Sequence, residues 1–210
     1  MAHRPISLSP SPTSLEAMEA RHLEAAVRIH LAGFPSFFLS FLGPRFLREF
    51  YNSFLADPVG MALVVCDPAG EVLGVVVGCV DPRGYFTRLL RRRWWAFCLA
   101  SLGAVAHRPS CLRRLVRACF YRGAAPSGSL RALLSSIVVV PAAQTHGVGK
   151  RLLRGWIEEA RRRGASGAYL TTDAEGNDAV NAFYHREGWR LESSYATKEG
   201  RRMNRYVLDW

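Results

Sequence analysis

The 210-residue sequence lacks acidic side chains over one long stretch, which runs from Pro82 to Leu130. This stretch holds ten arginines, and the whole chain has a formal net charge of +11, so the rest of the chain is close to neutral. A local excess of cations indicates an anionic partner for that segment. It does not indicate that the whole chain is a nucleic-acid-binding protein.

The cysteines lack the spacing of a disulfide framework or a zinc site. The chain has five of them, which is an odd number, and no CxxC pair occurs among Cys66, Cys79, Cys98, Cys111 and Cys119. Most of them stand among apolar residues. We therefore expect buried or free thiols in a reducing compartment and no bound metal.

The chain also lacks an apolar run that is long enough to span a membrane. The longest nearly uncharged run, residues 94–106, is shorter than the roughly 20 residues that a helix needs to cross a bilayer. Residues 1–14 have no signal-peptide core and predict a flexible leader. These features predict a cytoplasmic protein and leave open a peripheral contact with the inner membrane surface.

The remaining residues fit a single globular domain at 15–210, because 49% of the chain is hydrophobic and 21% is charged. Apolar periodicity predicts strands at 15–18, 60–67, 71–80, 133–140, 167–172, 189–195 and 203–210. It predicts helices at 21–32, 44–56, 86–106, 112–120, 147–163 and 177–186, with a small-residue linker at 123–128. The order of these elements indicates an α/β fold in which residues 82–128 form a basic helical insertion.

One strand–loop–helix unit carries the strongest chemical signal. The strand ends at Val140, and the loop reads Gln144-x-x-Gly147-x-Gly149 before the next helix begins. A loop with two glycines lets backbone N–H groups converge at the positive end of a helix dipole, which is an arrangement that binds a pyrophosphate. The dinucleotide fingerprint GxGxxG and the P-loop GxxxxGK[ST] are both absent.

This loop resembles the Q/R-x-x-G-x-G/A signature of the GCN5-related N-acetyltransferase (GNAT) superfamily. A second block, with Asn177, Tyr184 and Gly188-Trp189, is similar to the family's N-x-x-A/V-x-x-x-Y…G-F/W block at the expected distance. The resemblance covers residues 133–210 by motif and residues 15–80 by pattern. It implies a mixed, mostly antiparallel sheet that is splayed at one parallel strand pair, with acetyl-CoA as co-substrate and no metal.

The resemblance also implies roles for individual residues. The coenzyme-binding residues would be Val138, Val139 and Val140 along the pantetheine arm, Gln144, Thr145, His146, Gly147, Val148 and Gly149 around the pyrophosphate, Lys150 and Arg151 as nearby cations, and Asn177 on the pantetheine. A primary amine would attack the thioester directly, and Tyr184 would protonate the departing thiolate. A phenol with a pKa of about 10 is a plausible acid for this step.

The general base is not assigned by the motifs. Family members often carry a Glu on the strand before the loop, but here that strand reads Leu133-Leu-Ser135-Ser136-Ile137. Three alternatives remain open. They are Asp173 at the end of the following strand, His30 in the first helix, and a water molecule held by Ser135 or Ser136.

The acceptor is suggested by a weaker resemblance. The segment from Phe34 to Gly43 resembles the FPxxFLxxLG segment of bacterial members that are linked to amino-sugar pathways. It implies a nucleotide- or lipid-linked amino sugar as acceptor. Protein amines and other small-molecule amines remain alternatives, and so does a non-catalytic acyl-CoA-binding module held at a membrane.

The arginines and aromatic residues of 83–122 suit an anionic membrane surface or a phosphorylated acceptor. A solvated pair of amphipathic helices is the structural alternative. Nucleic acid is the least favoured partner, and the sequence predicts no oligomeric state.

Overall fold

The computed structural model describes residues 13–35, 37–107, 131–197 and 200–210. Its strands are β1 (Ser14–Ala17), β2 (Gly60–Cys66), β3 (Val72–Cys79), β4 (Arg131–Val139), β5 (Gly167–Asp173), β6 (Arg190–Ala196) and β7 (Arg202–Asp209). Its helices are η1 (Ala20–His22), α1 (Leu23–Gly33), α2 (Phe38–Phe41), α3 (Pro44–Ala56), α4 (Pro82–His107), η2 (Pro141–Ala143), α6 (Val148–Arg162) and α7 (Asp178–Arg186). The expected helix at 112–120 and the linker at 123–128 lie outside the described residues.

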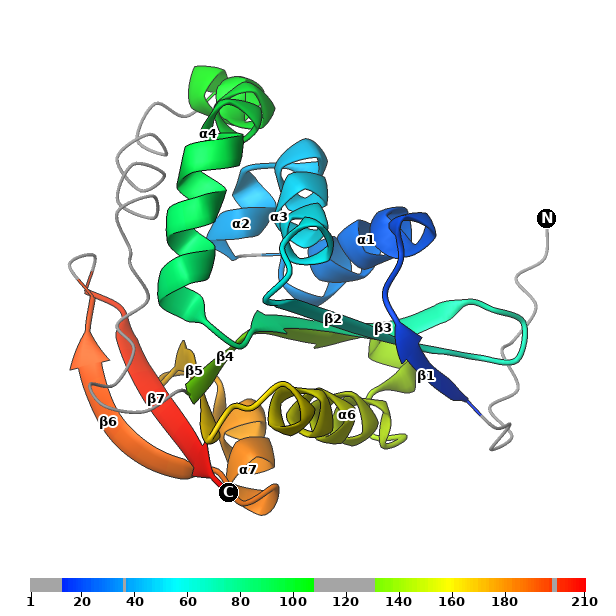
Figure 1. Ribbon diagram of the computed structural model, residues 1–210, viewed down its shortest axis with the longest axis vertical. Helices are drawn as coiled ribbons and strands as arrows, with labels where there is room; N and C mark the ends of the chain where they lie inside the picture. The colour runs from blue at the N-terminus through cyan, green and yellow to red at the C-terminus, as the bar shows by residue number, and fades with distance from the viewer. Residues whose placement is uncertain (1–12, 36, 108–130, 198–199) are drawn as a thin grey trace.

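The strands form one sheet in the order β1-β2-β3-β4-β5-β7-β6 (Figure 1). Among the strands of the described residues, only β4 and β5 run parallel, and the other neighbouring pairs are antiparallel. The parallel pairing covers only Arg131–Leu133 opposite Gly167–Tyr169. Beyond this point β4 continues beside β3 and β5 continues beside β7, so the two strands part. The α/β fold and the single splayed parallel pair are therefore confirmed.

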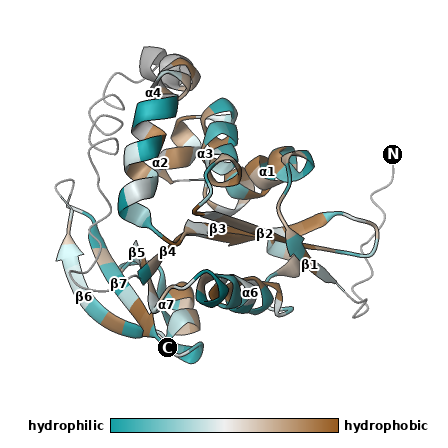
Figure 2. Cartoon of the chain, viewed as in Figure 1, coloured by the Kyte–Doolittle hydropathy of each residue, from teal (hydrophilic) through white to brown (hydrophobic). Residues whose placement is uncertain are grey.

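Helices cover both faces of the sheet. Helices α1, α3 and α4 lie on one face, and α6 and α7 lie on the other (Figure 1). Each side has its own apolar core, with Tyr51 and Phe54 buried on the first side and Trp156 and Trp189 buried on the second. The central strands between them are coloured as strongly hydrophobic in Figure 2. Burial on both faces explains the nearly continuous apolar runs of β2 and β3.

Strand β4 carries a bulge at the two serines that the sequence analysis noted. Gly78 pairs with Leu134 and Val77 pairs with Ser136, so one extra residue stands in β4. A bulge of this kind shifts the side-chain alternation by one position. As a result Val138 faces the core below α1 and α3, whereas Val139 packs on the α6 side.

Most element boundaries agree with the sequence pattern, and the differences have local causes. Helix α4 begins at Pro82, ahead of the expected residue 86, because Asp81 Oδ1 accepts the Gly84 N–H at 3.1 Å and caps the helix. The short helix α2 was not expected. Strand β1 begins at Ser14, so this residue belongs to the sheet.

Two further expectations concern cysteines and membranes. Cys66 and Cys79 are free and buried, as expected, and burial raises the pKa of both thiols. Cys111 and Cys119 lie outside the described residues. Within the described part of the chain, no helix combines the length and the apolarity needed to cross a bilayer.

Candidate active site

The site begins at the amino terminus of α6. Gly147 precedes the helix with φ of 79°, a left-handed conformation that favours glycine. The first helical hydrogen bond of α6 runs from the Arg151 N–H to Gly147 O, at 2.9 Å. Helix geometry leaves the N–H groups of residues 148–150 without an intrahelical acceptor. These amides and the helix dipole give the amino terminus of α6 the kind of donors that bind an anion.

In the loop before the helix, polar side chains donate hydrogen bonds to nearby backbone carbonyl oxygens. Gln144 Nε2 donates to Val139 O at 3.4 Å, His146 Nδ1 donates to Gln144 O at 2.9 Å, and the Thr145 hydroxyl donates to the same carbonyl. Residues 144–147 are all exposed. The Gln144 and His146 N–H groups also bond within this turn, to Pro141 O at 3.2 Å and to Ala143 O at 3.4 Å, so the amides at the start of α6 are the main donors for an anion. This donor set fits the pyrophosphate of CoA.

The two cations that follow the loop are engaged within the protein. Lys150 Nζ lies 3.2 Å from Glu187 Oε1, beyond the end of α7. Arg151 Nη1 donates to Thr13 Oγ1 at 2.6 Å. Phosphate contact by either side chain would therefore compete with these bonds.

Where β5 parts from β4, one backbone N–H group of β4 points toward the space between the two strands. Val140 N–H donates to Leu73 O of the β3 side at 2.9 Å. Because alternate residues of an antiparallel strand bond to the same neighbour, the Val139 N–H faces the opposite edge, where the parallel pairing has ended. Among Val138, Val139 and Val140, Val139 thus offers its N–H to a ligand between the parted strands.

Helix α7 brings the second motif to the same place. A Cβ atom on Gly149 would lie 3.7 Å from Val139 Cγ2 and 3.9 Å from Phe183 Cζ, so β4, α6 and α7 meet there. Asn177 precedes α7, but its side chain does not cap the helix. Its Nδ2 donates to Thr172 Oγ1 at 2.7 Å and to Asp173 O at 3.3 Å. Those bonds leave the Asn177 Oδ1 as an acceptor for a ligand amide.

Tyr184 lies inside this junction. Its side chain is 4% exposed and contacts the rings of Trp189 and Tyr206, each with a centroid separation of 5.8 Å. Burial raises the pKa of its phenol well above the usual value. The hydroxyl therefore stays protonated at physiological pH and acts as a hydrogen-bond donor.

Asp173 is engaged by a cation that the sequence analysis did not identify. Arg201 Nη2 lies 2.7 Å from Asp173 Oδ1 and 2.6 Å from Oδ2, and Arg201 Nε also donates to Oδ1. Both carboxylate oxygens of Asp173 thus accept hydrogen bonds from Arg201. No local signal in the sequence marks Arg201, because it stands in the connection between β6 and β7.

His30 is buried away from solvent. Its side chain shares a hydrogen bond of 2.8 Å between Nδ1 and the Tyr51 hydroxyl, and the residue is 1% exposed. Burial lowers the His30 pKa to about 4, which makes the ring a weak proton acceptor for an ammonium group. The Tyr51 hydroxyl also bonds to Ser136 at the β4 bulge. His30 is thus a neutral partner in a buried chain, and this chain fixes Ser136.

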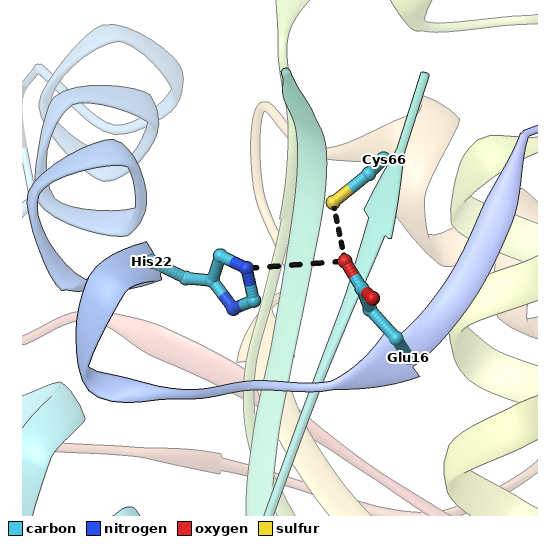
Figure 3. Close-up of side chains that lie close together, drawn as sticks. All are labelled: Glu16, His22 and Cys66. Atoms are coloured by element: carbon cyan, nitrogen blue, oxygen red, sulfur yellow. Dashed lines mark hydrogen bonds and ion pairs between the residues drawn. The ribbon is translucent and has the colours of Figure 1, made fainter. Parts of the chain in front are cut away.

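A separate cluster contains side chains that could bind a metal: Glu16, His22 and Cys66 (Figure 3). The Cys66 thiol donates to Glu16 Oε1 at 3.1 Å, and His22 Nε2 lies 3.8 Å from the same oxygen. The Glu19 N–H donates to His22 Nδ1 at 3.0 Å. A neutral ring that accepts at Nδ1 carries its proton on Nε2, and burial beside Glu16 raises the Cys66 pKa to about 12. Two of the three ligand atoms therefore hold protons, which does not suit a metal ion.

A sheet that parts at a short parallel pair, beside a helix amino terminus with free amides, defines the class of CoA-dependent acyltransferases. A model of the acetyltransferase (GNAT) family matches residues 26–189, and the chain belongs to this family. The resemblance noted in the sequence is thereby confirmed. Acetyl-CoA is the co-substrate of this family.

Solved structures share the fold at low sequence identity. The ribosomal-protein-S18-alanine N-acetyltransferase from Escherichia coli is 17% identical, with a TM-score of 0.58 and 94% of each chain covered. SsHAT is 19% identical, with a TM-score of 0.66 over 93% of this chain and 98% of its own. Ard1 from Thermoplasma volcanium is 13% identical, with a TM-score of 0.57 over 94% and 98%. No curated protein matches the sequence.

Proposed function

We propose that the protein transfers the acetyl group of acetyl-CoA to a primary amine, and that the acceptor is a nucleotide- or lipid-linked amino sugar. The observation that carries the proposal is the meeting of β4, α6 and α7 at Gly149, beside the point where β4 and β5 part. This arrangement gathers both sequence motifs at one place. The family assignment favours an enzyme over the non-catalytic module.

The coenzyme would be held mainly by backbone groups. The amides at the start of α6, with the loop Gln144–Gly147 before them, would bind the pyrophosphate. The Asn177 side chain would bind the pantetheine arm, and the Val139 N–H would remain for the carbonyl of the acetyl group. Backbone donors that are already fixed by the fold lose little entropy on binding, which suits a site that must hold a long flexible ligand.

The reaction would proceed without a covalent enzyme intermediate. The neutral amine attacks the thioester carbonyl, the N–C bond forms, and the C–S bond breaks. The proton leaves the acceptor ammonium for Asp173, directly or through water held at Ser135 or Ser136. The departing thiolate accepts a hydrogen bond from the Tyr184 hydroxyl. The acetylated nitrogen then loses its second proton, which reaches the thiolate through Tyr184, so the phenol ends the reaction protonated as it began. The Val139 N–H supports the developing oxyanion.

Thiol release from acetyl-CoA by the purified protein tests this proposal. The acceptor panel contains free amino sugars, phosphate- and nucleotide-linked amino sugars, polyamines, aminoglycosides and peptides with a free amino terminus. We expect release with the phosphate-linked amino sugars. Release with another class alone would replace the acceptor, and no release with any amine, while CoA still binds, would contradict the enzymatic function.

We also propose that α4 holds the enzyme at the cytoplasmic face of an anionic inner membrane. Arg91 and Arg92 are exposed, and Trp95 and Leu99 on the following turns are 54% and 59% exposed. Residues four apart share one helix face, so cations and apolar side chains lie along one stripe. Such a stripe supports interfacial binding, because the cations attract anionic headgroups and the apolar groups insert between them.

A further inference from the structure

The guanidinium group of Arg201 lies between a carboxylate and an aromatic ring. It forms the bidentate ion pair with Asp173, with N–O distances of 2.6 to 3.1 Å. Its Cζ atom also lies 5.0 Å from the centroid of the Phe37 ring. A carboxylate beside an aromatic face is a binding site for an organic cation, and in this structure the cation comes from the protein itself.

The three residues come from both sides of the parted strands. Asp173 is the last residue of β5. Phe37 follows α1, whose last residue Gly33 is so close to β4 that an added Cβ would lie 2.5 Å from Val138 Cγ2. Arg201 therefore links the β5 side to the segment that packs on the β4 side. The free amide of Val139 stands next to Val138 on that same strand.

Asp173 is held in place without the help of Arg201. Its backbone carbonyl accepts hydrogen bonds from Asn177 Nδ2 at 3.3 Å and from Asn181 Nδ2 at 3.0 Å. Phe37 packs on the Phe34 ring, with a centroid separation of 5.4 Å. The Asp173 backbone and the Phe37 ring are thus held by other contacts, so the carboxylate would stay close to the ring after Arg201 leaves.

Arg201 can leave this site at low cost. Its side chain is 43% exposed, so it has room to rotate into solvent. Its backbone is anchored independently, because its N–H donates to Thr197 Oγ1 at 3.2 Å and its carbonyl accepts the Thr197 N–H at 2.8 Å. Side-chain rotation alone would therefore free Asp173, and the hairpin would keep Arg201 nearby.

We propose that Asp173 and Phe37 bind the ammonium group of a zwitterionic acceptor, and that the displaced Arg201 binds the anionic group of the same molecule. This inference rests on the proposed function. One internal ion pair is exchanged for two intermolecular pairs, so an acceptor with both charges is favoured over an amine without an anion. The exchange also frees Asp173 to receive the ammonium proton.

The test compares two probes that differ only by a phosphate, glucosamine and glucosamine 1-phosphate. Their affinities are measured by titration calorimetry with saturating CoA, for the wild type and for Arg201→Gln. We expect the wild type to bind glucosamine 1-phosphate at least about tenfold more tightly than glucosamine, because charge-assisted bidentate pairs are strong. In Arg201→Gln the two affinities should differ by no more than about twofold, because the phosphate group then lacks the guanidinium that would bind it.

Arg202→Gln is the matched control. Arg202 is the neighbouring exposed arginine, and its Nε lies 3.9 Å from Glu175. Its removal lowers the net charge equally and should leave the phosphate preference unchanged. Asp173→Asn and Phe37→Leu should each weaken the binding of both probes, because both remove part of the cation site. Circular dichroism confirms that each variant is folded.

Two outcomes would overturn the inference: a phosphate preference that is the same in Arg201→Gln and the wild type, or no binding of either probe. The proposed function has a separate readout, because thiol release is measured with the whole amine panel. If amines are acetylated but the phosphate preference is the same in Arg201→Gln and the wild type, the proposed displacement of Arg201 is rejected and the enzymatic function stands. Binding of the probes without any thiol release would reject the enzymatic function alone.

Discussion

At the scale of single residues, the burial of ionisable groups governs the response to pH. His30 has a pKa of about 4 in the folded protein against 6.5 as its ordinary value. Between these values the unfolded chain binds more protons than the folded protein does, so the free energy of unfolding falls as the pH falls. The loss begins near pH 6.5 and is complete below about pH 4. It amounts to about 3 kcal/mol.

The substitution His30→Asn should flatten this pH dependence. Asparagine keeps a polar group near the Tyr51 hydroxyl but has no titrating ring. The difference in unfolding free energy between wild type and variant should therefore shrink by about 3 kcal/mol from pH 7 to pH 4. Urea unfolding at several pH values measures it. An unchanged difference across this range would contradict a buried neutral His30.

The substitution Tyr184→Phe tests the proposed role of the Tyr184 hydroxyl in the reaction. Tyr184→Phe should reduce kcat by roughly 10- to 100-fold, because it deletes the proposed hydrogen bond to the departing sulfur. The KM for acetyl-CoA should remain within about twofold, since the ring still packs on Trp189 and Tyr206. Steady-state kinetics provide the measurement.

Tyr195→Phe is the control for that experiment, because it deletes the same hydroxyl from β6, where Tyr195 is 40% exposed. It should leave kcat unchanged. Equal effects of the two substitutions, or a wild-type kcat in Tyr184→Phe, would remove Tyr184 from the chemistry.

At the scale of elements, the start of α6 depends on one backbone conformation. Gly147→Ala has room for its methyl group, because nothing lies within 4 Å of an added Cβ, but its φ of 79° is unfavourable for alanine. We expect a loss of about 1 kcal/mol in unfolding free energy and weaker CoA binding, because the loop relaxes. Thermal unfolding with and without CoA measures both effects.

The matched control is Gly149→Ala, two residues further along the same helix. Its added Cβ would make ordinary contacts of 3.7 and 3.9 Å, and it lies inside α6. Alanine favours helix there, so stability should not fall. An equal loss of CoA binding in both variants would show that the effect is not due to the left-handed conformation.

At the scale of the whole molecule, charge is separated between a neutral body and a basic segment. Arg88 of this segment is used structurally, since its Nε and Nη2 donate to Asp57 at 2.8 and 2.9 Å. Arg91 and Arg92 are exposed on the same helix. Among the described side chains of α4, Arg88 thus anchors the helix to Asp57, whereas Arg91 and Arg92 lie on its exposed surface.

The double substitution Arg91→Gln/Arg92→Gln should weaken binding to vesicles that contain anionic phosphatidylglycerol. Each arginine contributes about 1 kcal/mol at such a surface, so the partition coefficient should fall roughly 30-fold. Vesicle co-sedimentation at low and physiological salt measures it. The control Arg161→Gln/Arg162→Gln removes the same charge from α6. Equal losses in both double variants would indicate nonspecific attraction by net charge.

The sequence alone predicted most of the elements and the family motifs, because these depend on local order. Apolar periodicity located α3 at Pro44–Ala56 with its observed bounds, and Gly147 indicated the turn at which α6 begins. Such signals lie within one helix or one turn, where backbone geometry relates neighbouring residues directly. The start of α4 was missed because a single capping side chain, Asp81, decides it.

The tertiary structure decided the contacts between distant residues. Asp173 meets Arg201 across 28 positions and His30 meets Tyr51 across 21, and no periodicity relates either pair. The parting of β4 and β5 follows from strand order in the sheet, which depends on how the two cores pack. A side chain's partner across the fold is set by that packing, so the occupied cation site at Asp173 and the neutral state of His30 emerged only from the folded molecule.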